Sequence, residues 1–310
     1  MPLRTAACLP APCLFALLMV LASGARAADL PPKPSVAELV QASSSADWRA
    51  LDDDNTLYME LPGGRVVIEL APAFAPRHAA NIKALVREQY FDGLAVVRSQ
   101  DNYVAQWGDP DEATPRPIKH AQEKLTAEFT VPLANLRTNP HTFTRLPDRD
   151  GFAPQVGHWN GFPSARDPRS GRAWLTHCYG MVGVGRDNDA DSGSGASLYV
   201  VTGHAPRHLD RNITVVGRVV SGMPLLATLP RGSKPLGFYA SGETMAPVRS
   251  MTVAADLPPE QRSRFDVMRT DSATYQKVID AQRNRGGPWV KVAAGYIDLC
   301  NAAIPVRPHP

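Results

Sequence analysis

The stretch from Tyr90 to Pro110, YFDGLAVVRSQDNYVAQWGDP, predicts two β-strands separated by a polar turn. The first strand is an apolar run that ends at Arg98, and the second is aromatic and β-branched and contains Gln106. Side chains two apart on a strand share a face, so Val96 should point with Arg98, and Val104 with Gln106. If the strands are neighbours, the guanidinium and the amide share one apolar surface. The spacing also fits a simpler arrangement, in which Arg98 is a strand-end charge that reaches water and Gln106 is an ordinary edge residue.

The same stretch resembles the core of the cyclophilin-type peptidyl-prolyl isomerases. In that family an aromatic-His-Arg piece is followed by a short turn and by Phe-Met-x-Gln-Gly-Gly-Asp. A second match is HLDRNITVVGRVVSGM at residues 208–223, which resembles the family's LDGKHxVFGxVxxGM. The resemblance covers about residues 55–110 and 178–255, in the order of the family.

The resemblance implies a site made of an arginine, its amide neighbour and an apolar floor. The catalytic residues that it implies are Arg98 and Gln106, and the substrate-binding residues are Tyr103, Val104, Ser197, Tyr199, His208 and Leu209. Several polar residues of the family's site are replaced here. The aromatic-His pair is Val96-Val97, the glutamine on the Gly-rich segment is Ser197, the asparagine is Gly183, and the histidine is Ile213.

Prolyl isomerisation needs no nucleophile and no acid-base pair, because no covalent bond is broken. Rotation about an X-Pro bond breaks amide resonance and has a barrier of about 18–20 kcal/mol. Arg98 would donate hydrogen bonds as the prolyl nitrogen becomes pyramidal, and these bonds must strengthen in the twisted state to accelerate the reaction. Gln106 would orient Arg98, and the rigid donor fork of arginine suits this task better than lysine. No cofactor is required.

The surrounding pattern predicts a mainly β fold. Period-two alternation over residues 57–61 and 65–70 predicts a β-hairpin, and Pro76 should begin a helix that reaches about Glu88. The resemblance implies that these elements open a closed, antiparallel, eight-stranded β-barrel capped by helices, with its substrate on the outside.

The composition of the chain after residue 27 predicts three segments. Residues 28–54 should hold a Pro-rich start and a short helix, residues 55–255 the cyclophilin-like domain, and residues 256–310 a helical C-terminal extension. Within the domain, residues 110–177 are rich in proline and lack periodicity, which predicts a long insertion of loops. This insertion either narrows or extends the substrate groove, or only elaborates the surface.

Two features are expected beyond residue 255. Pro258-Pro259 and Asp271-Ser272 should each precede a helix, and residues 289–292 and 296–300 suggest a last hairpin or edge strand.

The first residues predict export. Arg4 precedes an apolar run, and Ala25-Arg26-Ala27 supplies the small-x-small cleavage pattern of a signal peptide, so residues 1–27 should be removed. The apolar run is short for a membrane span. We therefore expect a periplasmic or secreted protein with no membrane span in the mature chain. Loss of Arg4 and Arg26 lowers the formal charge from +3 to +1, so no nucleic-acid partner is implied.

Only Cys178 and Cys300 remain after such cleavage. An even pair in an oxidising compartment favours one disulfide, and two buried free thiols are the alternative. The histidines at 120, 141, 158 and 177 are irregularly spaced, and no metal site is expected.

These features lead to one preferred function and two alternatives. We expect an isomerase that acts on proline-containing polypeptides and assists the folding of exported proteins. The first alternative is a binding or chaperone module whose catalysis has faded, which the replaced polar residues favour. The second, a small-molecule carrier, lacks a supporting motif.

Overall fold

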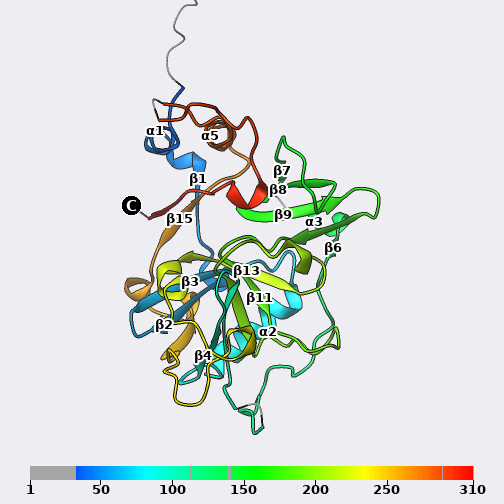
Figure 1. Ribbon diagram of the computed structural model, residues 1–310, viewed down its shortest axis with the longest axis vertical. Coiled ribbons are helices and arrows are strands. Elements are labelled where there is room, and N and C mark those ends of the chain that lie inside the picture. The colour runs from blue at the N-terminus through cyan, green and yellow to red at the C-terminus, as the bar shows by residue number, and fades with distance from the viewer. Residues whose placement is uncertain (1–32, 112, 138–140, 288, 310) are drawn as a thin grey trace, which may run out of the picture. The chain divides into compact units, whose positions relative to one another are not determined.

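A computed structural model describes residues 33–111, 113–137, 141–287 and 289–309 (Figure 1). The predicted signal peptide lies outside the described residues. Within them, no helix combines the length and the apolar character that crossing a bilayer requires.

One antiparallel sheet of eight strands carries the predicted site. Its order is β14-β2-β3-β13-β11-β12-β5-β4. The strands are β2 (Thr56–Leu61), β3 (Gly64–Leu70), β4 (Ala95–Ser99), β5 (Val104–Gly108), β11 (Met181–Val184), β12 (Leu198–Val201), β13 (Val215–Ser221) and β14 (Ser250–Val253). The predicted hairpin is confirmed, because β2 pairs with β3 from Thr56 opposite Glu69 to Leu61 opposite Gly64.

The two edge strands, β4 and β14, are joined through the chain segment that precedes β14. Val96 N donates to Ala246 O at 2.9 Å, and Val248 N donates to Leu94 O at 2.8 Å. Only isolated bridges, such as Ala95 with Pro247, accompany these bonds. The expected barrel is therefore a curled eight-stranded sheet, whose edges are linked by irregular backbone bonds rather than by a continuous ladder.

Helix α2 (Pro76–Arg87) forms where the sequence predicts a helix, and its buried face packs against the curled sheet. Pro76 stands in its first turn, where a missing N–H costs no hydrogen bond. Ile82 and Leu85 are fully buried and belong to the core that also contains Val96 and Trp107. The helix thus supplies the apolar filling on which the site strands rest.

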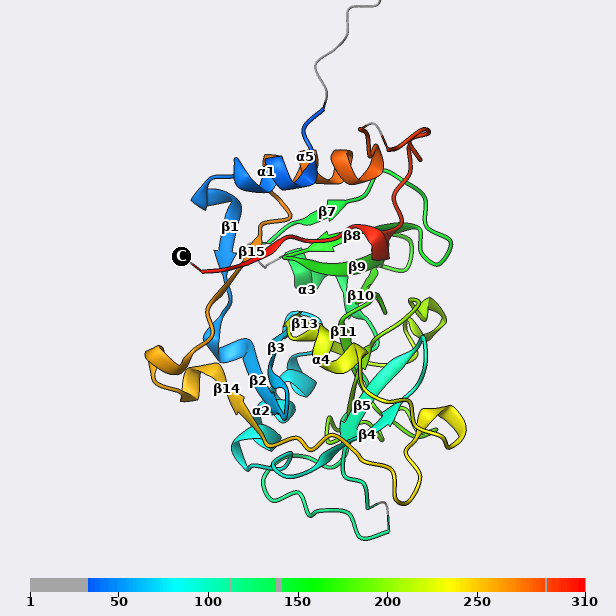
Figure 2. The ribbon, with the colours of Figure 1, turned by 60° about the vertical axis from the view of Figure 1, so that its left-hand side comes forward.

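Residues 110–177 are not the loops that we predicted. They contain a five-stranded antiparallel sheet of order β6-β10-β9-β8-β7 (Figure 2). Its elements are β6 (Val131–Pro132), α3 (Leu133–Arg137), β7 (Phe143–Arg145), β8 (Gln155–Trp159), β9 (Phe162–Asp167) and β10 (Arg172–Leu175). Gly157 and Pro163 lie inside strands and hide the alternation, because both residues are poor strand formers.

The N-terminal and C-terminal segments share a third sheet of order β1-β15-β16. Its strands are β1 (Trp48–Ala50), β15 (Phe265–Met268) and β16 (Val306–Pro308). The predicted helices α1 (Val36–Gln41) and α5 (Ala273–Arg283) are confirmed, and Ser35 forms a capping box with Glu38 at the start of α1. The last strand expected within residues 289–300 is wrong, since that stretch holds no strand among its described residues and the strand comes later.

The remaining helices are short. They are α4 (Met223–Ala227) and the 3₁₀ turns η1 (Ser45–Asp47), η2 (Asp53–Asn55), η3 (Arg207–Leu209), η4 (Pro235–Gly237), η5 (Ala254–Asp256), η6 (Pro259–Gln261) and η7 (Leu299–Asn301). The extension after residue 255 is therefore helical only in part. The domain boundaries at 55 and 255 stay predictions.

A buried ionic group ties the three sheets together. Glu69 on β3 accepts from Arg218 at 3.0 Å and from Arg49 of β1 at 2.6 Å. Arg49 also donates to the carbonyl of Asn160, between β8 and β9, at 2.7 Å. One carboxylate thus joins the curled sheet to both of the others, and satisfied charges of this kind are costly to break.

His158 should make the protein acid-sensitive. This side chain is fully buried, 3.1 Å from the Tyr275 hydroxyl, and burial lowers its pKa to about 3. An unfolded histidine has a pKa of about 6.5, so the neutral form favours the fold. The contribution of His158 to the free energy of unfolding is therefore fully present above pH 6.5 and falls by about 1.4 kcal/mol per pH unit from there toward pH 3.

Urea unfolding between pH 7 and pH 4.5 measures this dependence. His158→Gln cannot be protonated and should flatten the slope, whereas His204→Gln on the exposed surface should leave it as it is. An equal slope in the wild type and in His158→Gln would contradict the assignment.

Candidate active site

A β-bulge in β4 separates the core from the predicted site. Val96 pairs with Trp107, Arg98 pairs with Gln106, and the register shifts between the two pairs. Trp107 and Gln106 are adjacent on β5 and so point to opposite faces. Our prediction that Val96 and Arg98 share a face is therefore wrong: Val96 enters the core and Arg98 lies on the outer face.

The guanidinium of Arg98 is held by three acceptors. Its Nη1 donates to Gln106 Oε1 at 3.2 Å, its Nε donates to Leu236 O at 2.6 Å, and its Nη2 donates to Gln100 Oε1. Gln106 in turn donates from Nε2 to Ser197 Oγ at 2.9 Å. The amide of Gln106 is thereby fixed, with its oxygen toward the arginine. The structure brings together Arg98, Gln106 and Ser197, as the sequence predicts.

Aromatic rings flank the same guanidinium. Its carbon lies 5.6 Å from the ring centre of Tyr103 and 5.2 Å from that of Phe238. Burial lowers the pKa of Arg98 below its ordinary value. An arginine nevertheless stays charged at neutral pH, so the site offers one oriented, partly desolvated cation.

An apolar floor lies beside Arg98 on the outer face of the sheet. Val104, Tyr199 and Val201 are buried together, and Tyr103 and Ile213 pack against them half-buried. The floor comes from β5 and β12, which are hydrogen-bonded neighbours. An arginine beside such a floor, on the outside of a curled antiparallel sheet, is the arrangement that the sequence motifs imply.

Residues 56–251 match the cyclophilin type peptidyl-prolyl cis-trans isomerase family. The chain belongs to this family.

Two curated relatives support the assignment. A probable peptidyl-prolyl cis-trans isomerase of Brucella suis biovar 1 (strain 1330) is 29% identical over 185 residues, which cover 60% of this chain and 76% of the relative. A putative thylakoid lumen peptidyl-prolyl cis-trans isomerase of Synechocystis sp. (strain ATCC 27184 / PCC 6803 / Kazusa) is 25% identical over 189 residues, which cover 58% of this chain and 45% of the relative. This cyclophilin is thus a peptidyl-prolyl isomerase.

A solved cyclophilin has a similar fold. The crystal structure of cyclophilin AquaCyp293 from Hirschia baltica superposes with a TM-score of 0.64 at 28% sequence identity. The match covers 76% of this chain and 87% of that chain.

A buried chain of polar contacts holds Tyr199 from behind the floor of this cyclophilin. The Tyr199 hydroxyl lies 2.9 Å from His177 Nε2, and His177 Nδ1 lies 2.9 Å from Asp210 Oδ1. Asp210 also accepts from Arg207 at 2.6 Å, and Arg207 reaches Asp150 at 2.9 Å. Since a carboxylate can only accept, Nδ1 of His177 carries the proton that it donates to Asp210.

Asp150 belongs to the insertion, so this polar chain connects the insertion to the floor. Arg207 and Asp210 are three residues apart, and Asp210 stands in the motif at residues 208–223. Asp150, His177 and Tyr199 lie far from them in the sequence, so the sequence alone did not indicate that these side chains would meet.

His208 and Leu209 are placed differently. They lie on η3, with His208 exposed and Leu209 half-buried, and neither belongs to the apolar cluster around Tyr199. Their role in binding substrate stays a prediction. No cluster of three metal-ligating side chains occurs in the part of the chain that the structure describes.

Gly183 makes room for the Tyr199 ring. The two residues face each other across β11 and β12, and a Cβ on Gly183 would lie 2.3 Å from the tyrosine Oη and 2.4 Å from its Cζ. The glycine that replaces the family's asparagine at position 183 therefore leaves the space that the Tyr199 ring and its hydroxyl occupy. We expect Gly183→Ala to displace the ring, to cost about 1–3 kcal/mol of stability and to lower isomerase activity.

Urea unfolding and peptide turnover measure the two effects of Gly183→Ala. Gly151→Ala is the matched control, because its added Cβ would meet no atom within 4 Å. Equal stability of the two variants would show that the ring has room to move.

Proposed function

We propose that this cyclophilin isomerises X-Pro bonds in exported polypeptides, with Arg98 and Gln106 as its catalytic pair. The observation that carries the proposal is the Arg98 guanidinium, fixed by Gln106 at 3.2 Å beside the floor of Val104 and Tyr199. Arginine has five N–H groups, and the three contacts described above use one on each nitrogen. One N–H on Nη1 and one on Nη2 stay available for a substrate.

The proposed mechanism uses those donors in the twisted state. A proline ring would lie on the apolar floor, with its peptide bond beside Arg98. As the amide twists, its nitrogen becomes pyramidal and gains a lone pair that accepts from the guanidinium. Because the arginine is oriented in advance by Gln106, little reorganisation accompanies this bond, and its gain in the twisted state lowers the barrier.

Tyr103, Ser197, His208 and Leu209 complete the proposed substrate site. Tyr103 flanks the guanidinium and Ser197 holds the amide of Gln106, so both would act beside the proline ring. His208 and Leu209 would contact the residues before or after proline.

Export is proposed on three grounds. The residue pattern at 1–27 is that of a signal peptide. Cys178 and Cys300 form a disulfide, which is typical of proteins in oxidising compartments. One relative is named as a thylakoid lumen protein. Fractionation of cells that express the full chain tests the location, and a full-length cytoplasmic product would refute it.

A protease-coupled assay on a chromogenic proline-containing peptide tests the enzyme directly. We expect a turnover rate that is proportional to enzyme concentration and well above the uncatalysed isomerisation. The alternative of a faded binding module is favoured by Ile213, Val97 and Ser197 in place of polar residues of the family. That alternative requires peptide binding without acceleration, which the same assay, combined with a binding measurement, distinguishes.

A further inference from the structure

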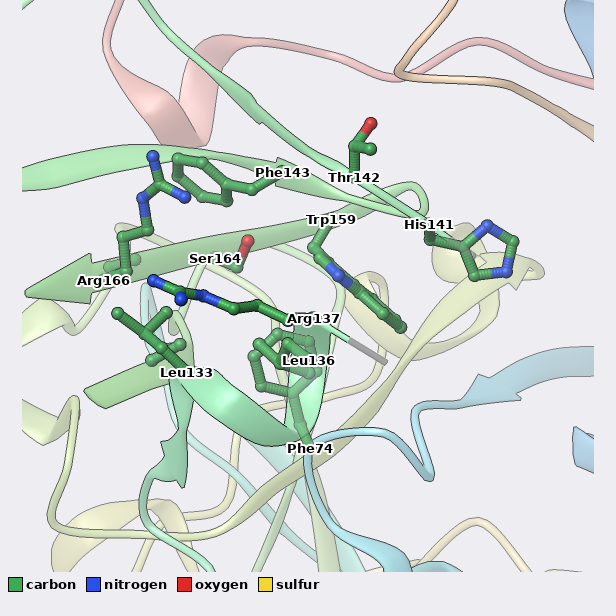
Figure 3. Close-up of a pocket in the computed structure, with 12 residues that line it drawn as sticks. Phe74, Leu133, Leu136, Arg137, His141, Thr142, Phe143, Trp159, Ser164 and Arg166 are labelled. Carbon is green, nitrogen blue, oxygen red and sulfur yellow. The ribbon is translucent and has the colours of Figure 1, made fainter. Parts of the chain in front are cut away.

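The five-stranded sheet of the insertion carries a pocket of about 400 Å³ that shares no residue with the isomerase site (Figure 3). Its inner wall is apolar and aromatic. Phe74, Leu136 and Trp159 line it and are buried, and the rings of Phe74 and Trp159 meet edge to face at 5.3 Å. Volumes of about 300–1,000 Å³ with such walls are typical of small-ligand sites.

One end of this pocket is positively charged. Figure 3 shows the guanidinium groups of Arg137, from α3, and Arg166, from β9, at the same end, with His141 at the other. Arg166 lies 4.2 Å above the Phe143 ring and donates from Nε to Gln155 at 2.6 Å. Its two Nη groups have no hydrogen-bond partner among the described residues. The side chain is therefore fixed in place while its bidentate edge is unused.

No carboxylate of the described residues neutralises the positive charge at this end. Neither Arg137 nor Arg166, nor the nearby Arg145 on β7, forms an ion pair with any carboxylate in the described ranges. Burial and repulsion by Arg145 and Arg137 lower the pKa of Arg166. The fully buried arginines, Arg207 and Arg218, are each paired with a carboxylate, whereas the half-buried Arg166 is not. An anion at this end would relieve the repulsion.

We propose that this pocket binds a carboxylate carried on an aromatic or branched apolar group. The planar carboxylate matches the free Nη edge of Arg166 and forms a bidentate pair, with Arg137 as the second cation. The apolar group fills the space against Trp159 and Phe74. A singly charged anion suits a site with apolar walls, because each further charge adds a desolvation cost. Two sources carry this chemistry: a free amphipathic acid, and the C-terminal residue of a polypeptide.

Calorimetry with the protein lacking residues 1–27 tests the proposal. The probes are N-acetyl-L-phenylalanine and its neutral counterpart N-acetyl-L-phenylalaninamide, which differ at the carboxyl group alone. We expect the acid to bind at least tenfold more tightly than the amide. Equal affinities, or no saturable binding at millimolar concentrations, would overturn the proposal.

Arg137→Gln tests whether the acid binds at this pocket or is attracted only by the general positive charge of the surface. Arg137 is exposed and forms no ion pair among the described residues, so its replacement should leave the fold intact. We expect about tenfold weaker binding of the acid. Arg169→Gln is the matched control, since Arg169 is also exposed and stands in the turn between β9 and β10 outside the pocket. An equal loss in both variants would refute the site.

Peptides of six residues that end in phenylalanine, with a free or an amidated C-terminus, distinguish the two sources. If only the peptide with the free C-terminus binds tightly, the ligand is the C-terminal residue of a polypeptide. If neither peptide binds but N-acetyl-L-phenylalanine does, the ligand is a free acid. Binding should be the same in Arg98→Ala, because the two sites share no residue. The proposal therefore stands or falls separately from the catalytic role of Arg98.

Discussion

Arg98→Ala is expected to lower kcat/KM for prolyl isomerisation by about 10²-fold, which is the usual effect of removing one preorganised donor in a catalytic site. The guanidinium is the one cation held beside the apolar floor in our mechanism, and no second group replaces its donors to the prolyl nitrogen. KM should change less than kcat, because the hydrogen bond strengthens in the twisted state. The protease-coupled assay at several substrate concentrations separates the two constants.

Two further variants give the Arg98 experiment its controls. Arg98→Lys keeps the charge but loses the planar fork that meets Gln106, so it should recover only a small part of the activity. Arg264→Ala removes an exposed arginine elsewhere in the chain and should leave turnover unchanged. If Arg98→Ala folds normally and keeps wild-type turnover, the proposed mechanism is refuted.

The sequence predicted correctly those strands and helices whose formation depends on the residues within each segment. The hairpin of β2 and β3 alternates with period two, and α2 begins at Pro76, so both could be placed from the sequence. The sheet within residues 110–177 could not, because its strands are short and contain Gly157 and Pro163. Their identity as strands depends on pairing between segments rather than on the composition of each one.

The same distinction separates the site residues that were predicted from those that were missed. Arg98 and Gln106 lie eight residues apart on a hairpin, and the family motif names both. The bulge that turns Arg98 outward leaves no mark in the spacing, so the shared face with Val96 was wrong. Leu236, which accepts from Arg98, lies 138 residues away, and only the folded chain brings it there.

The polar chain behind Tyr199 changes how the missing family residues are understood. Replacing the family's asparagine by Gly183 removes a polar group from the site, but it also admits the tyrosine ring. The Tyr199 hydroxyl contacts His177, and the contacts that continue from His177 to Asp150 connect the floor to the insertion. In the sequence, the glycine at position 183 suggested that catalysis had faded. In the structure, it makes room for Tyr199, whose contact with His177 supports the apolar floor in another way.

Breaking the Cys178–Cys300 disulfide is expected to cost about 2–5 kcal/mol of the free energy of unfolding. The bond joins residues 122 apart in the sequence, just before β11 and within η7, so it constrains a long loop of the unfolded chain. Loop-closure entropy for a loop of this length corresponds to about 5 kcal/mol, which is the upper end of the expected range. Cys178 is buried in the core that also contains Trp174 and Tyr275, so the bond fastens the C-terminal segment to that core.

Urea unfolding of the wild type and of a Cys178→Ala, Cys300→Ala double variant, each with and without reductant, measures this cost. Reductant should destabilise the wild type by the cost of the bond and should leave the double variant unchanged. Thiol titration of the denatured wild type should detect two more thiols after reduction than before it. Equal stability of the oxidised wild type and the double variant would mean that packing alone holds residues 296–302 against the core, and that the covalent bond adds nothing to it.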